Sequence, residues 1–228
     1  MSKKTLTNIT RTLKERIPLP RYTLGEELIN AISHGIGALF GIVIMILCII
    51  KCAFAHNTVG IVGSAIYGTS MILLYTISCL YHSLKRNKGK RIFRILDHCS
   101  IFLLIAGTYT PFTLVTLPKG IGFTIFGIIW ASAIIGIVLN AIDMKRFSKL
   151  SMACYLIMGW LIIFAFPTLR DHLHPAGIRL LIGGGIAYTA GTITYALGSK
   201  HRYMHSIWHF FVLAGSMLHA FSVLLYVV

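Results

Sequence analysis

The chain has 228 residues, of which 56% are hydrophobic and only 12% are charged. A soluble domain usually carries about 25% charged residues, so this composition provides too little charge for a water-facing surface of this size. It excludes a soluble enzyme, a nucleic-acid-binding protein and a disordered tail. The formal net charge of +15 is instead typical of basic loops gathered on one side of a membrane.

The apolar residues are arranged in segments long enough to cross a bilayer. A spanning helix needs roughly 20 apolar residues for about 30 Å of hydrocarbon, and its backbone groups must be satisfied internally. We therefore predict an all-α, polytopic membrane protein with seven transmembrane helices in one domain. The predicted spans are Ile29–Ala53, Thr58–Tyr81, Leu96–Leu117, Ile121–Ala141, Leu150–Thr168, Ile178–Leu197 and His205–Val228.

Residues 1–28 precede the first predicted span and form a short basic arm. The arm begins without an apolar core, so we do not expect a cleavable signal peptide. The transmembrane domain is expected to occupy residues 29–228. Its five cysteines form no C-x-x-C pair and are odd in number, which favours small buried side chains over disulfides or a zinc ribbon.

The basic residues define the expected orientation. The side of the membrane that carries the N-terminal arm holds seventeen Lys and Arg, and the opposite side holds four. Because cytoplasmic loops are enriched in these residues, we predict a cytoplasmic N-terminus and an external C-terminus. The loop predicted after the second span holds Lys85, Arg86, Lys88, Lys90, Arg91 and Arg94.

Polar side chains collect at the cytoplasmic ends of four predicted spans. Ionisable groups inside a membrane are energetically expensive, so such a collection indicates a functional site. The first, second, third and seventh spans all contribute to it. Its members are Glu26, Glu27, Asn30, Ser33, His34, Ser78, His82, Asp97, His98, His205 and His209.

Spacing within this collection predicts a metal site. His205 and His209 are four residues apart and so share one helix face. With His82 from a second helix they provide three imidazoles, the usual ligand set of a catalytic zinc with one open position. Asp97 would orient or deprotonate the metal-bound water, and the Ser78 hydroxyl would hydrogen-bond a substrate carbonyl or its oxyanion.

Three further histidines have less direct interpretations. His98 points roughly 100° away from Asp97 on a helix, so we expect it to support or pack against the site. His34 is either a fourth site residue or a partner of Glu27 on the same helix face. His219 would lie about 15 Å deeper than His209, too far to share an ion. A single intramembrane histidine is more often a helix contact than a ligand.

Four segments taken together resemble the hemolysin III family, the bacterial branch of the progestin and adipoQ receptor family, which includes the adiponectin receptors. The resemblance extends from Tyr22 to the end of the chain. The segments are E-E-L-I-N-A-I-S-H-G (Glu26–Gly35), S-C-L-Y-H-S (Ser78–Ser83), D-H-C-S-I-F-L-L-I-A-G-T-Y-T-P-F (Asp97–Phe112) and H-S-I-W-H (His205–His209).

This resemblance implies seven helices, an inward N-terminus and a zinc ion near the cytoplasmic face. It assigns the zinc to His82, His205 and His209, and it matches the family's aspartate and serine to Asp97 and Ser78. The chain also shares with the family a motif of Glu27, Asn30 and His34, to which the resemblance assigns no defined role. The alkaline ceramidases, which are similar membrane hydrolases, cleave lipid amides, and family members are linked to cytolysis and to control of membrane lipid composition.

Three functions remain open on this basis. The first is a zinc-dependent hydrolase of a lipid amide or ester, with membrane lipids as partners and substrate. The second is a regulator of membrane lipid homeostasis in which zinc only joins helices. The third is a cytolysin, which the hydrophobic character of the spans disfavours. The short polar arm argues against an adiponectin-type hormone receptor, and no nucleic-acid partner is expected.

Overall fold

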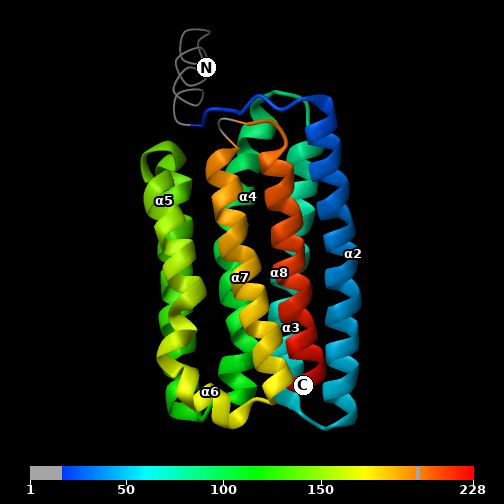
Figure 1. Ribbon diagram of the computed structural model, residues 1–228, viewed down its shortest axis with the longest axis vertical. Coiled ribbons are helices and arrows are strands. Elements are labelled where there is room, and N and C mark those ends of the chain that lie inside the picture. The colour runs from blue at the N-terminus through cyan, green and yellow to red at the C-terminus, as the bar shows by residue number, and fades with distance from the viewer. Residues whose placement is uncertain (1–16, 199–200) are drawn as a thin grey trace, which may run out of the picture.

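The computed structural model of the chain describes residues 17–198 and 201–228. Every regular element in these ranges is helical, which confirms the all-α prediction. The long helices run side by side along one axis (Figure 1). They are α2 (Leu24–Phe54), α3 (Thr58–Ser83), α4 (Lys88–Pro111), α5 (Lys119–Trp160), α7 (Pro175–Leu197) and α8 (Met204–Tyr226). Three short elements complete the described chain: helix α6 (Phe166–His172), a π-helical turn η1 (Phe112–Thr116) and a 3-10 turn η2 (Leu161–Ala165).

Six helical segments of the described chain are long and apolar enough to cross a membrane, as expected for a multi-pass membrane protein. Large apolar side chains such as Leu39, Ile135 and Ile157 are exposed on the outside of the bundle. A soluble protein seldom exposes so much contiguous apolar surface, whereas a bilayer covers it. The outer surface of the bundle is therefore suited to contact lipid.

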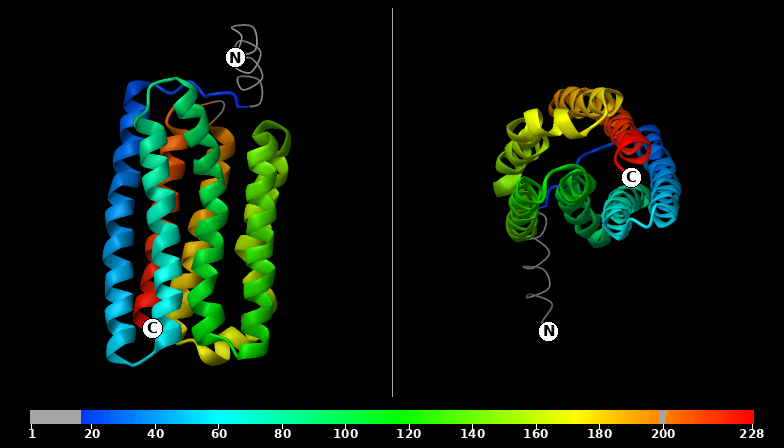
Figure 2. Two further views of the ribbon diagram at one scale, coloured as in Figure 1. Left: turned by 180° about the vertical axis from the view of Figure 1, so that it is seen from behind. Right: turned by 90° about the horizontal axis from the view of Figure 1, so that it is seen from below.

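The longest of these segments, Lys119–His172, has 54 residues, far more than one crossing needs. Its helix is interrupted at Asp143, whose φ of −156° and ψ of 90° are not helical. The chain reverses its direction there, and the two arms lie side by side (Figures 1 and 2). The Asp143 carboxylate accepts a hydrogen bond from the backbone N–H of Arg146 at 3.0 Å and so caps the second arm.

The first helix begins earlier than the predicted Ile29 because its N-terminus has a complete capping box. The Thr23 side chain accepts from the Glu26 backbone N–H, and the Glu26 carboxylate accepts from the Thr23 backbone N–H at 2.8 Å. This reciprocal pair satisfies two donors that a helix start otherwise leaves free. Residues 1–16 of the predicted arm, with their basic residues, lie outside the described residues.

The structure corrects the predicted loop after the second span. Helix α4 begins at Lys88, so Lys90, Arg91 and Arg94 lie on a helix and not in a loop. The helix starts there because the Asn87 side chain accepts from the Lys90 backbone N–H at 2.9 Å. Lys90 is only 2% exposed as a result. A basic residue expected in solvent is therefore inside the bundle.

Small residues let the helices approach closely. Helix α2 packs on α3 and α8, α3 on α4, and α7 on α8. At Gly37 on α2, a Cβ atom would come within 2.5 Å of the Tyr75 ring on α3. The five cysteines are free, as predicted; Cys48, Cys52 and Cys99 are buried, whereas Cys79 and Cys154 are only partly buried.

We expect Gly37→Ala to destabilise the bundle by about 1–3 kcal/mol, because the new methyl group must displace the buried Tyr75 ring. Thermal unfolding of detergent-purified protein measures the effect. The matched control is Gly127→Ala on α5, where a Cβ meets nothing within 4 Å. Equal unfolding temperatures for the two variants would contradict the close α2–α3 contact.

Candidate metal centre

Three histidines from two helices meet at one end of the bundle. His82 lies in the last turn of α3, and His205 and His209 lie near the start of α8. Their ligand nitrogens are all within 4.8 Å of one another. The two Nε2 atoms on α8 are 3.2 Å apart, because residues four positions apart stack on one helix face. The sequence therefore correctly predicted that these three side chains come together.

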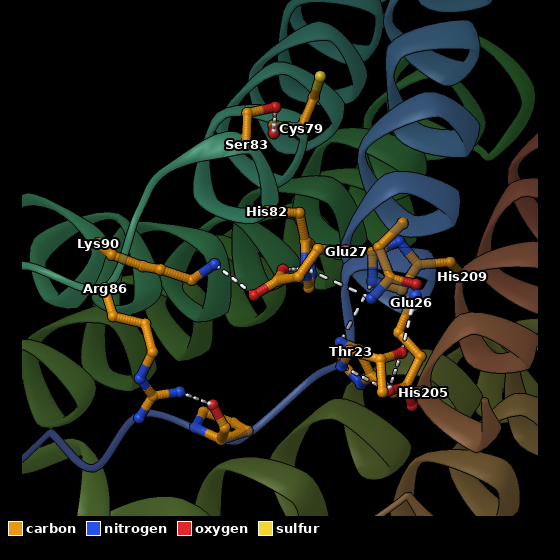
Figure 3. Close-up of polar contacts among 12 residues, drawn as sticks. Thr23, Glu26, Glu27, Cys79, His82, Ser83, Arg86, Lys90, His205 and His209 are labelled. Atoms are coloured by element: carbon orange, nitrogen blue, oxygen red, sulfur yellow. Dashed lines mark hydrogen bonds and ion pairs between the residues drawn. The ribbon is translucent and has the colours of Figure 1, made fainter. Parts of the chain in front are cut away.

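The Glu27 carboxylate connects this group to a third and a fourth helix (Figure 3). Its Oε2 lies 2.7 Å from Nδ1 of His82, and its Oε1 accepts from Nζ of Lys90 at 2.5 Å. A carboxylate can only accept, so Nδ1 of His82 carries the proton and donates it. In the neutral ring, Nε2 then presents a free lone pair. This Nε2 is buried and has no hydrogen-bond partner within the described chain.

The other two residues of the shared motif also lie beside the histidines. The Asn30 amide nitrogen is 3.4 Å from Nδ1 of His82. The His34 ring stacks on His209 with centroids 3.8 Å apart, and it meets the edge of Tyr75. Stacked rings do not aim their nitrogens at a common ion, so His34 supports His209 by packing. The alternative pairing of His34 with Glu27 is wrong, because Glu27 binds His82 and Lys90.

The two predicted catalytic side chains lie around this group without belonging to it. Asp97 Oδ2 is 3.6 Å from Nδ1 of His98. Ser78 is 1% exposed and lies one turn before His82 on α3. Their roles in catalysis stay predictions. His98 itself lies 3.3 Å from the Tyr195 hydroxyl, outside the group of three, as its helix face predicted.

His219 is also outside the group of three. Its Nε2 lies 3.0 Å from the Leu181 carbonyl oxygen, at the contact between α7 and α8. This agrees with the depth that the sequence predicted for it.

Sequence reasoning missed two residues at the site, Tyr22 and Lys90. The Tyr22 ring stacks on His205 with centroids 4.9 Å apart and an interplanar angle of 15°. Burial raises the pKa of the Tyr22 phenol above its ordinary value, so the ring stays neutral there. Lys90 is seven residues before Asp97, and that helical spacing was an available signal. Tyr22 precedes the first helix, where no periodicity could have placed it.

The segment that carries Tyr22 is fixed to the bundle by two arginines. Arg86 donates to the carbonyl oxygens of Leu19 and Pro20, and Arg91 donates to that of Ile17. Glu26 accepts from the backbone N–H of Tyr203 at 2.8 Å and so ties the start of α2 to the start of α8. These contacts hold the chain across the end of the bundle where the histidines lie.

The donor set fits a zinc ion. Two ligands about 2.0–2.1 Å from a tetrahedral zinc lie roughly 3.3 Å apart, which matches the 3.2 Å between the Nε2 atoms of His205 and His209. The carboxylate behind His82 is the partner that metal-bound histidines commonly have. Nε2 of His82 is buried without a hydrogen-bond partner in the described chain, so its lone pair is free for a metal ion. Three protein ligands leave a fourth position free.

The fold and this site define a polytopic helical membrane protein with a buried group of three histidines. Comparison with known proteins gives the family. The family model described as "Haemolysin-III related" matches residues 22–220, and the chain belongs to that family.

Similar proteins include the "Hemolysin-3" of Bacillus cereus, 48% identical over 89% of this chain and 92% of that protein. The "Hemolysin-3 homolog" of Bacillus subtilis (strain 168) is 47% identical over 91% of this chain and 97% of that protein. The human "Monocyte to macrophage differentiation factor" is 22% identical over 69% of this chain and 67% of that protein. No solved structure matches the chain.

We expect Glu27→Gln to weaken zinc affinity about 10–100-fold, because the amide no longer fixes the His82 ring as the carboxylate does. Competition with a zinc chelator on purified protein measures this affinity. The matched control is Glu26→Gln, because this neighbouring carboxylate binds Thr23 and Tyr203 and no histidine. Equal zinc affinities for both variants would contradict the assigned role of Glu27.

Proposed function

We propose that the protein is a zinc-dependent intramembrane hydrolase of lipid amides or esters. The observation that carries this proposal is the buried group of His82, His205 and His209 with a carboxylate behind its first member. Buried imidazoles at this density are costly in a membrane protein unless they serve a site. Three ligands with one position free are typical of catalytic zinc, whereas structural sites are usually closed by four ligands.

We also propose seven crossings with a cytoplasmic N-terminus. The interruption at Asp143 divides the 54-residue segment Lys119–His172 into two arms, and each arm counts as one crossing. An odd number of crossings agrees with the start of α2 and the C-terminus lying at opposite ends of the bundle (Figure 1). The excess of Lys and Arg on the N-terminal side supports the orientation.

The protein's own side chains have separate roles in this proposal. His82, His205 and His209 would hold the zinc ion, which would act as a Lewis acid and lower the pKa of a bound water to about 7. Glu27 keeps Nδ1 of His82 protonated and its Nε2 free to bind. Asp97 takes up the proton released from the attacking water, and Ser78 holds the substrate carbonyl. The Tyr22 ring covers His205 and limits access of bulk water.

Two apolar cavities support a lipid substrate. They have volumes of about 100 Å³ and about 420 Å³, and they adjoin between α4, α5, α7 and α8. Tyr109, Trp160 and His219 line both of them. The smaller cavity also reaches Trp208 and Val212, which flank His209 along α8. An acyl chain lodged there would bring its polar end toward the histidines.

The test measures zinc and lipid cleavage in the same preparations. We expect about one zinc per chain in purified wild type, and we expect His205→Ala to lose both the metal and fatty-acid release from a lipid amide. Elemental analysis and product detection provide the two readouts. His172→Ala is the control, since that exposed side chain lies outside the group of three. Well-folded wild type without metal would contradict the proposal.

A second candidate function is cytolysis, favoured by the name of the 48% identical Bacillus cereus relative, "Hemolysin-3". Lysis of erythrocytes by purified protein that persists in His82→Ala would favour cytolysis over hydrolysis. Zinc binding without cleavage of any lipid amide or ester would instead favour a metal that joins helices, in a regulator of membrane lipid homeostasis.

A further inference from the structure

A polar pocket of about 150 Å³ lies apart from the three histidines, between α4, the turn of α5 and α7. Arg94 and His98 line it from α4, Lys145 and Ser148 from α5, and Tyr195 from α7. No Asp or Glu is among its lining residues in the described part of the chain. The lining of the pocket therefore has two cationic side chains and no carboxylate.

Arg94 is the side chain that most needs a partner. Its Nε and Nη1 atoms are buried and have no hydrogen-bond partner within residues 17–198 and 201–228. Asp97 Oδ2 lies 3.6 Å from Nδ1 of His98, and no described carboxylate lies within 4 Å of the Arg94 guanidinium. Two other basic side chains near the start of this helix have partners: Lys90 binds Glu27, and Arg91 donates to the Ile17 carbonyl oxygen. Buried guanidinium nitrogens without an acceptor are costly, so an anion that reached them would stabilise Arg94.

The neutral side chains of the pocket already have partners in the protein. The Ser148 hydroxyl donates to the Lys145 carbonyl oxygen, and the Tyr195 hydroxyl lies 3.3 Å from Nε2 of His98. The attraction for a ligand must therefore come from the guanidinium of Arg94 and the ammonium of Lys145. The guanidinium fork matches the geometry of phosphate oxygens, and phosphate also accepts from lysine.

The position and size of the pocket agree with such a ligand. The turn of α5 around Asp143 lies at the same end of the bundle as the starts of α2 and α8 (Figures 1 and 2). Helix ends of a membrane protein lie at the level of the lipid headgroups. Holding one water requires roughly 10–15 Å³, so about 150 Å³ has room for a phosphate group with several waters.

We propose that this pocket binds a phosphate group, as the headgroup of an anionic phospholipid or as free phosphate. Arg94 would bind the phosphate through two guanidinium nitrogens, and Lys145 would balance the remaining charge. None of the three histidines lines the pocket. Phosphate binding there would therefore require neither zinc nor hydrolysis, and the pocket would be a second site, one that recognises an anion, at this end of the bundle.

The test uses full-length protein purified in detergent. Native mass spectrometry measures binding of phosphatidylglycerol and phosphatidylcholine, and thermal unfolding measures protection by sodium phosphate against sodium chloride at equal ionic strength. We expect wild type to bind one phosphatidylglycerol about tenfold more tightly than the zwitterionic lipid. Arg94→Gln should weaken this binding at least about tenfold.

The matched pair is Lys145→Gln and Lys149→Gln. These exposed lysines are one turn apart, and only Lys145 lines the pocket. This pair decides the question even if Arg94→Gln does not fold. Binding lost several-fold in Lys145→Gln and kept in Lys149→Gln supports the site.

The two probes also distinguish the sources of the phosphate group. Protection by phosphate alone would identify a free-phosphate site, and selective phosphatidylglycerol binding would identify a lipid site. Equal binding by the two lysine variants, or no effect of either probe on wild type, would overturn the proposal.

Discussion

The carboxylate of Glu27 is the interaction on which the end of this bundle depends. It lies on α2, binds His82 on α3 at 2.7 Å and binds Lys90 on α4 at 2.5 Å. In a low-dielectric interior such a charge is stable only when it is paired and hydrogen-bonded. The contacts with His82 and Lys90 meet both requirements, and they fix the positions of α2, α3 and α4 relative to one another. Because His82 faces the pair on α8, this carboxylate also orients the surface against which His205 and His209 pack.

The ligand group could be predicted from the sequence, because depth and helical spacing alone place His82, His205 and His209 together. Its surroundings could not. Lys90 enters the bundle only because the Asn87 side chain starts α4 at Lys88, and the hydropathy pattern had placed it in a loop. Tyr22 reaches His205 from an extended segment held by arginine–carbonyl contacts. Periodicity carries information about helix faces and none about such tertiary contacts.

The turn in α5 illustrates a different limit of sequence reasoning. Hydropathy predicted two spans, Ile121–Ala141 and Leu150–Thr168, separated by a polar loop. In the structure the helical hydrogen bonding continues almost through this region, and the direction changes at the single non-helical residue Asp143. The polar residues there serve as a cap and as one wall of the Arg94 pocket. Composition therefore identified the boundary between the two spans, whereas the backbone geometry at Asp143 makes that boundary a sharp turn and not a loop.

The arrangement of polar and apolar interior surfaces explains why both proposed sites lie at one end. The three histidines and the Arg94 pocket are near the helix ends, while the cavities between α4, α5, α7 and α8 are lined almost wholly by apolar side chains. A lipid has the same division between a polar head and an apolar chain. Its chain would gain from burial in the cavities, and its head would be held at the depth of the histidines and Arg94. The interior of the bundle is thus polar at one end and apolar further along, as one leaflet of a bilayer is. A water-soluble substrate would not need the apolar part.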